Sequence, residues 1–128
     1  MPFVRISTTE HFDEAARSAI GDGVHRALVD AIAIPEADRF QVITAHPESE
    51  IIWDRGYLDV DRSDRAVFVH ISLRDGRDDD KKRALYAAIT RNLERSPGVR
   101  PQDVLIVLQE NVSANWSFGN GIAHYAKR

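Results

Sequence analysis

The chain has 128 residues, a length typical of one domain, and its 17 basic and 20 acidic side chains give a net charge of −3. This balance argues against binding to the phosphate backbone of nucleic acids, which requires a basic surplus. The chain contains no cysteine, which excludes disulfides, thiolate zinc sites and cysteine nucleophiles. No apolar run is long enough to cross a membrane, and the first residues lack the layout of a signal peptide. We therefore expect a single cytoplasmic domain over residues 1–128, with no membrane partner.

The sequence repeats itself at an offset of 65 residues, without a gap. Over residues 4–46 the two copies share nine identities. Two of the identical pairs are Asp13 with Asp78 and Asp38 with Asp103. Because the match keeps the phase of both strands and helices, it predicts a duplicated structural unit.

The first half reads as strand, helix, strand. Apolar and polar residues alternate over residues 3–6, a pattern typical of a short strand. We expect Thr8 or Thr9 to cap a helix whose apolar stripe runs over residues 12–32. A strand at residues 39–45 would complete the unit.

The second half follows the same plan. It predicts a strand at residues 66–73, a helix that begins at residues 78–80, and a last strand at residues 104–108. Between the halves, residues 51–60 are expected to form a hairpin or a short excursion at the edge of the sheet.

These elements predict an α/β fold of two βαβ units, one over residues 2–46 and one over residues 66–110, followed by a tail at 111–128. The units would form a four-stranded mixed sheet with both helices on one face. The last strand is apolar at the five positions 104–108, which predicts that it is buried on both faces. Since two helices cover only one face, we expect a second copy of the chain to cover the other.

The usual signals of metal and cofactor sites are missing. The five histidines are scattered, and none forms a pair at metal-ligand spacing near an acidic third ligand. The sequence has no phosphate-binding loop and no dinucleotide-binding glycine pattern. We therefore expect an activity with no metal and no cofactor.

Proline is the second residue of the chain, directly before the first predicted strand. A small residue at this position normally permits removal of the initiator Met1, which would expose the secondary amine of Pro2. An α-amino group titrates near pH 8, and burial or a neighbouring arginine lowers its pKa further. Such an amine can act as a base, as an acid when protonated, or as a nucleophile towards a carbonyl.

Together with Pro2 and the duplication, three segments resemble the tautomerase superfamily, and within it most closely the malonate semialdehyde decarboxylase branch. The segments are residues 34–41, Arg74–Arg77, and Glu110–Asn111 with Asn115–Gly119. The resemblance covers nearly the whole chain. It implies a homotrimer of subunits built from two βαβ units, with an amino-terminal proline as the catalytic group.

The resemblance assigns a role to seven residues. Pro2 matches the catalytic amine, and Asp38 matches the acid that assists it and positions water. Arg74 matches the first of two arginines that hold the substrate carboxylate. The second is expected at Arg77, although the branch spaces its arginines two apart and the direct counterpart here is Gly76. The apolar wall of the pocket matches Trp116 and Phe118, with Tyr125 added from the tail.

The resemblance implies an enzyme that acts on a small oxo carboxylate, with decarboxylation of malonate semialdehyde as the leading reaction. The alternatives are keto-enol tautomerisation of a 2-oxo acid and hydration of an unsaturated 3-halo acid. The residues themselves also allow simpler roles: Asp38 capping a turn, Arg74 lying on the surface, Trp116 packing at a subunit interface. A hypothesis of another class is a non-catalytic, ferredoxin-like ligand-binding module, since the fold alone does not establish an activity.

Overall fold

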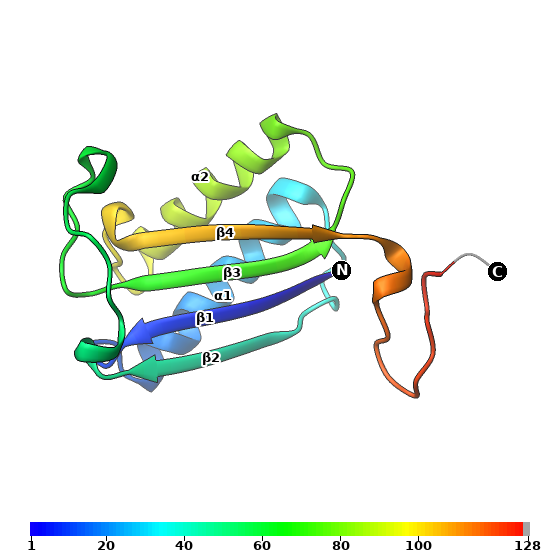
Figure 1. The fold of residues 1–128 in the computed structure, drawn as a ribbon, viewed down its shortest axis with the longest axis horizontal. Coiled ribbons are helices and arrows are strands. Elements are labelled where there is room, and N and C mark those ends of the chain that lie inside the picture. The colour runs from blue at the N-terminus through cyan, green and yellow to red at the C-terminus, as the bar shows by residue number, and fades with distance from the viewer. Residues whose placement is uncertain (127–128) are drawn as a thin grey trace.

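The structure is a computed structural model in which residues 1–126 are described. Its four strands form one mixed sheet in the order β2-β1-β3-β4 (Figure 1). The strands are β1 (Pro2–Thr9), β2 (Gln41–His46), β3 (Val67–Arg74) and β4 (Val104–Asn111). The pairs β1–β2 and β3–β4 are parallel, and the central pair β1–β3 is antiparallel. The predicted α/β architecture is therefore confirmed.

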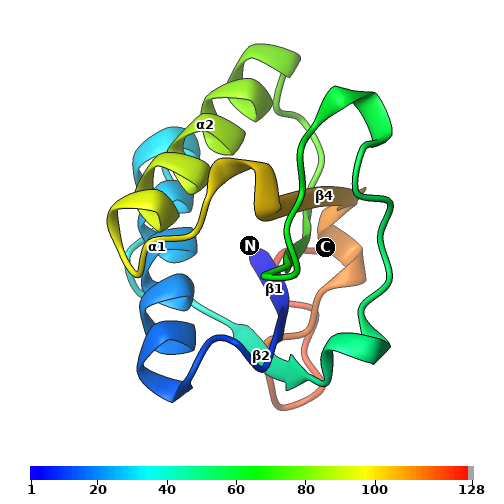
Figure 2. The same ribbon diagram turned by 90° about the vertical axis from the view of Figure 1, so that its left-hand side faces the viewer.

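Two helices, α1 (Glu14–Ile32) and α2 (Asp79–Arg95), cover the same face of the sheet (Figure 2). The carboxylate of Asp13 caps α1, and the carboxylate of Asp78 caps α2 in the same way. The prediction that Thr8 or Thr9 caps the first helix is wrong, because both residues belong to β1 and pair with neighbouring strands. No helix in residues 1–126 is long and apolar enough to cross a membrane.

The duplication predicted at an offset of 65 residues is visible in the strand register. In the antiparallel pair β1–β3, Arg5 lies opposite His70, its own counterpart in the repeat. The two parallel pairs also share one register, since Val4 pairs with Gln41 and Val67 pairs with Val104. The two βαβ units are thus related by a pseudo-twofold axis that passes between β1 and β3.

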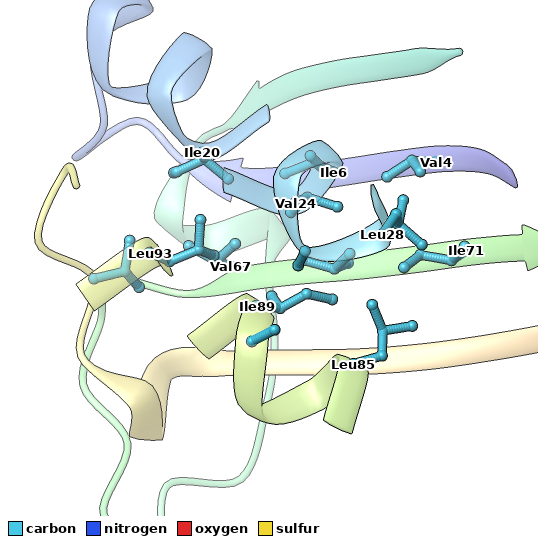
Figure 3. Close-up of a cluster of buried hydrophobic side chains, with 14 of the residues drawn as sticks. Val4, Ile6, Ile20, Val24, Leu28, Val67, Ile71, Leu85, Ile89 and Leu93 are labelled. Carbon is cyan, nitrogen blue, oxygen red and sulfur yellow. The ribbon is translucent and has the colours of Figure 1, made fainter. Parts of the chain in front are cut away.

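The core lies between the sheet and the two helices (Figure 3). Ile6 and Ile71 of the central strands belong to one cluster with Ile20 of α1 and Ile89 of α2, and all four side chains are fully buried. Burial of aliphatic side chains of this size contributes about 1.5–3 kcal/mol each, so this layer supplies much of the driving force for folding.

The other face of the sheet remains partly open. Ile106 and its neighbours on the same side of β4 pack against the core, but Leu105 and Val107 are 39% and 47% exposed. In a single chain β4 is therefore covered on one face only, and burial of its other face by a second copy stays a prediction. The alternation follows from the two-residue period of a strand, because the helices cover only one face.

The segment between β2 and β3 folds back on the open side of the sheet (Figure 2). Of the two alternatives expected for residues 51–60, a hairpin or a short excursion, the hairpin is not formed; in this described part of the chain there are two short 3₁₀ turns, Glu48–Glu50 and Tyr57–Asp59. Arg62 holds the second turn by donating to three backbone carbonyls of residues 54–60. Trp53 packs against Phe68 of β3, with ring centroids 5.4 Å apart. Side-chain packing, and not strand pairing, fixes this segment.

Candidate active site

The start of β1 and the ends of β3 and β4 meet at one edge of the sheet. They meet there because β1 is antiparallel to β3, so that Pro2 pairs with Leu73, and because β4 runs parallel to β3. A cavity of about 210 Å³ opens at this edge. It is lined by Met1, Ala33, Ile34, Pro35, Asp38, Arg74, Arg77 and Tyr125.

Asp38 lies in the segment that connects α1 to β2, and its carboxylate faces the N-terminal amine. The Met1 amine donates to Asp38 Oδ2 at 2.6 Å, and both side chains are largely buried. The second oxygen, Oδ1, is buried without a hydrogen-bond partner among the described residues. An unsatisfied buried carboxylate oxygen costs free energy, so this oxygen is a strong acceptor for a water molecule or a substrate hydroxyl.

The two arginines lie where β3 passes into α2: Arg74 is the last residue of β3, and Arg77 lies on the turn that follows. Gly76 has a φ of +114°, a conformation that disfavours a side chain, so the turn requires glycine where the decarboxylase pattern has arginine. The turn brings Arg77 back towards Arg74, and Arg77 Nη1 donates to the Arg74 carbonyl at 2.9 Å. Burial and the positive charge of Arg74 lower the pKa of Arg77, while Glu110 opposes this shift. Two guanidinium groups therefore line the same cavity as Asp38.

The segment after β4 brings an aromatic cluster to the same edge of the sheet. Phe118 is at its centre. Its ring stacks on that of Trp116 and makes an edge contact with that of Tyr125, with ring centroids 5.6 Å apart in both pairs. Phe118 also packs against Phe40, at 5.4 Å. Trp116, Phe118 and Phe40 line a second, mainly apolar cavity of about 260 Å³, next to the one that Tyr125 lines. Charged and apolar surfaces thus meet at Tyr125.

Comparison with known proteins shows the family of the chain. The chain matches two models of the family described as tautomerase enzyme, one over residues 38–119 and one over residues 2–54. The chain belongs to the tautomerase family. It is 37% identical to the probable tautomerase YusQ of Bacillus subtilis (strain 168), over 96% of this chain and 97% of that protein.

Two solved structures extend the likeness to three dimensions. The crystal structure of the FG41 malonate semialdehyde decarboxylase inhibited by 3-bromopropiolate is 42% identical, with a TM-score of 0.92 over 96% of this chain and 93% of that one. A second malonate semialdehyde decarboxylase is 32% identical, with a TM-score of 0.90 over 96% and 95% of the two chains. The whole fold of the tautomerase family is therefore shared.

The structure brings most of the predicted site residues of this tautomerase together. Asp38, Arg74, Arg77 and Tyr125 line one cavity, and Trp116 and Phe118 line its apolar neighbour. Pro2 is buried at the start of β1, but it is Met1 that contributes to the cavity lining and donates to Asp38.

Two residues that contribute to the site, one aromatic and one polar, were not predicted from the sequence. Phe40 supports the aromatic cluster, and Asn111 accepts a hydrogen bond from the Trp116 indole at 2.5 Å. Both residues lie in the segments that carry the resemblance, which was the signal available for them.

A further hollow, with a volume of about 430 Å³, lies elsewhere, between α1 and α2. Its charges are mostly paired within the protein: Arg26 binds Glu36, and Arg39 binds Asp22. The hydrogen bond from Arg26 lowers the pKa of Glu36, as expected for an ion pair. Because these guanidinium groups already have partners, the hollow offers a ligand less than the cavity at Asp38.

One group of metal-type ligands is present at the opposite edge of the sheet. His11, Glu48 and Asp64 place one ligand atom each within 4.8 Å of one another, and all three residues are exposed. No local sequence pattern indicates this cluster, because its members come from three separate segments. Exposed acidic groups commonly gather in this way without an ion, so the cluster does not establish a metal site.

Proposed function

We propose that this tautomerase-family protein is a cofactor-independent enzyme that decarboxylates malonate semialdehyde with Pro2 as its catalytic amine. The single observation that carries the proposal is the cavity at Asp38, where a carboxylate, an N-terminal amine and two guanidinium groups meet. The similarity to two malonate semialdehyde decarboxylases supports this choice of substrate.

The arginines would hold the substrate by its carboxylate. A guanidinium group binds a planar carboxylate with two parallel hydrogen bonds, and Arg74 and Arg77 supply two such groups in one turn. Tyr125 and the adjoining aromatic cluster would supply the apolar side of the pocket. An apolar surface favours the neutral product over the charged carboxylate, because desolvation of a charge is costly.

The amine would stabilise the electrons released on decarboxylation. The bond between the carboxylate carbon and C2 breaks, carbon dioxide leaves, and the electron pair moves through C2 into the carbonyl to give an enol or enolate. A protonated Pro2 that donates to the carbonyl oxygen would stabilise this charge. Alternatively, the neutral amine would form an iminium at the carbonyl carbon with loss of water; decarboxylation would then give an enamine, and the same water balance is restored when hydrolysis releases the product and the amine. Protonation at C2 then yields acetaldehyde. Asp38 would orient the amine and hold it in its protonated form.

This mechanism requires that Met1 is removed. Met1 contributes to the cavity lining, and its amine takes the partner that the mechanism assigns to Pro2. Cleavage after Met1 would clear this part of the cavity and turn the Pro2 nitrogen from an amide into a basic secondary amine. We infer that the chain becomes active on this cleavage.

A second reaction is favoured by one specific observation. Asp38 Oδ1 is buried without a partner in the described residues, which suits it to hold and activate water. The same site would then hydrate an unsaturated 3-halo acid or its acetylenic analogue. Tautomerisation of a 2-oxo acid needs only a neutral Pro2 amine, and the name of the relative YusQ as a probable tautomerase supports testing it.

We infer that the enzyme works as a homotrimer. Leu105, Val107 and Val42 expose apolar surface on the uncovered side of the sheet, which a second copy would remove from water. The three-copy state is what the family resemblance implies. Light scattering after size exclusion should give about three times the 14.4 kDa of the chain. Leu105→Glu should lower this mass.

The decisive experiment combines intact mass with activity. Mass spectrometry of the purified protein shows whether Met1 is removed, and activity is measured on malonate semialdehyde and on the enol of phenylpyruvate. Pro2→Ala should abolish most of the activity, whereas the matched control Pro47→Ala, at the opposite edge of the sheet, should not. Full activity with Met1 retained, or activity indifferent to Pro2→Ala, would refute amine catalysis. A protein that binds these oxo acids without turnover would instead be a ligand-binding module.

A further inference from the structure

The last residue of β4, Asn111, contacts two parts of the site that are far apart in sequence. We propose that Asn111 is a positioning residue that ties the arginine turn to the aromatic wall of the pocket. Only the effect on kinetics rests on the proposed function. The hydrogen bonds of Asn111 are a property of the free protein and are tested there.

The main chain of Asn111 holds the arginine turn. In the β3–β4 register Asn111 pairs with Arg74, the last residue of β3. The Asn111 carbonyl then accepts a hydrogen bond from the Asp75 amide at 2.8 Å, one residue beyond the strand. This bond continues the β-ladder into the turn, so the start of the turn is fixed by β4.

The side chain of Asn111 holds the aromatic wall. A short 3₁₀ turn, Ser113–Asn115, reverses the chain directly after β4 and returns Trp116 to Asn111. The indole Nε1 of Trp116 then donates to Asn111 Oδ1 at 2.5 Å. Trp116 is half-buried, and an indole N–H in this setting needs a partner, because leaving it unpaired costs free energy.

The two contacts form one continuous path across the site. From Trp116 the path continues by ring stacking to Phe118, and from Phe118 by an edge contact to Tyr125. Tyr125 lines the cavity that holds Asp38 and Arg74. Without its anchor at Asn111, the segment after β4 would keep its ring contacts but lose the polar bond that sets its position relative to the arginines.

The hydrogen bond can be tested in the free protein by the indole N–H signals in a proton–nitrogen correlation spectrum. The chain has two tryptophans, and Trp116→Phe identifies the signal of Trp116. Asn111→Leu should shift that signal and leave the signal of Trp53, which donates to the Ser63 carbonyl at the opposite edge of the sheet, in place. Asn111→Asp keeps an acceptor oxygen and should retain a hydrogen-bonded signal. An unmoved Trp116 signal in Asn111→Leu would overturn the proposal.

The consequence for catalysis is tested with a double-mutant cycle. We expect Asn111→Leu to lower kcat/KM on malonate semialdehyde about tenfold, mostly through KM, because the wall contacts the substrate in the ground state and in the transition state alike. Trp116→Phe should have a similar effect, and the double variant should be little worse than either single variant. Asn111→Asp should recover most of the activity, and the exposed control Asn115→Leu should leave it unchanged. Additive effects in the cycle would refute the coupling.

A separate measurement distinguishes this proposal from the proposed function. Malonate, a non-reacting dicarboxylate, is titrated into each variant. The indole N–H signal of Trp116 is followed, or a ring signal of Tyr125 where Trp116 is replaced. If the parent protein does not turn over malonate semialdehyde, the proposed function fails. The positioning role then still predicts weaker malonate binding in Asn111→Leu, and equal affinity in the two proteins would overturn it.

Discussion

Asp38 and Asp103 occupy equivalent positions in the two halves of the molecule, yet their carboxylates have different hydrogen-bond partners. Asp103 is 1% exposed and fully paired, since it accepts from the Ser63 amide at 2.8 Å and from the Ser63 hydroxyl at 2.6 Å. Asp38 accepts from the Met1 amine through one oxygen, and its other oxygen is buried and free in the described structure. The same fold position thus holds a carboxylate with both oxygens hydrogen-bonded at one edge of the sheet and, at the other, a carboxylate with one oxygen free among the described residues.

The difference follows from what precedes each central strand. In the second half, the segment before β3 packs against the sheet and places Ser63 against the carboxylate. In the first half, Met1 precedes β1 directly, so Asp38 meets an amine in place of a serine. The turns after β1 and β3 differ as well: Arg77 lines the cavity, whereas Phe12, its counterpart in the repeat, is buried. The cavity therefore draws on both units, with Asp38 from the first and Arg77 from the second, while their counterparts Asp103 and Phe12 are buried.

The largest effect on activity should come from removing the negative charge of Asp38. Asp38→Asn should lower kcat/KM on malonate semialdehyde by about 10²–10⁴, the usual contribution of a group that assists proton transfer. Its thermal midpoint should change little, because the carboxamide has nearly the same shape. Steady-state kinetics and a thermal melt on one preparation check both parts. An active Asp38→Asn enzyme would reduce Asp38 to a turn residue.

The equivalent change at Asp103 should have the opposite result, with a loss of stability and little change in kcat/KM. Asp103→Asn leaves the amide and hydroxyl of Ser63 facing a weaker, partly donating group, and we expect a loss of about 3 kcal/mol in the free energy of unfolding. The kcat/KM of the folded protein should stay close to that of the parent. Urea unfolding monitored by fluorescence measures the loss. A catalytic defect as large as that of Asp38→Asn would erase the distinction between the two copies.

The sequence predicts the scaffold better than the site, for physical reasons that particular residues show. Repeated apolar spacing located both helices, and the identity of Asp13 with Asp78 marks two real helix caps. The cap expected at Thr8 or Thr9 was wrong, because pairing with two neighbouring strands extends β1 past the point where local signals end it. The hairpin at residues 51–60 failed for a similar reason: the contact of Trp53 with Phe68 joins positions that no local pattern connects.

Within the site, the residue types came from resemblance and their geometry came only from the fold. Nothing in the spacing of Arg74 and Arg77 shows that the turn closes on itself, since that depends on the positive φ of Gly76. The link from Asn111 to Trp116 depends on a reversal of the chain after β4. Neither feature has a periodic signal in the sequence.

A smaller effect is expected at Arg77, whose counterpart in the repeat is the uncharged Phe12, and it should be visible in the pH dependence of KM. Burial and the charge of Arg74 both disfavour the protonated form of Arg77 and lower its pKa, but a guanidinium still stays charged in the alkaline range. A lysine at this position starts from an ordinary pKa of about 10.4, and the same two causes lower it. Arg77→Lys should therefore show a KM that rises as the pH increases from neutral into the alkaline range. The KM of the parent enzyme should stay flat there.

Kinetics at several pH values test this expectation, with Arg83→Lys as the matched control, because Arg83 pairs with exposed Asp80 outside the cavity. An Arg77→Lys enzyme whose KM follows the parent at every pH would mean that Arg77 does not hold the substrate carboxylate.

The smallest effect on stability should come from removing one of the two hydrogen bonds between Ser63 and Asp103. Ser63→Ala removes the hydroxyl that donates to Asp103 Oδ2 but keeps the amide that donates to Oδ1, so about 1 kcal/mol of stability should be lost. For a chain of this size the thermal midpoint should fall by about 3–5 °C. Combined with Asp103→Asn, it should cost less than the sum of the two single losses, because both changes act on one contact. Additive losses would mean that Asp103 stabilises the second half through other neighbours, and that the contrast with Asp38 does not depend on Ser63.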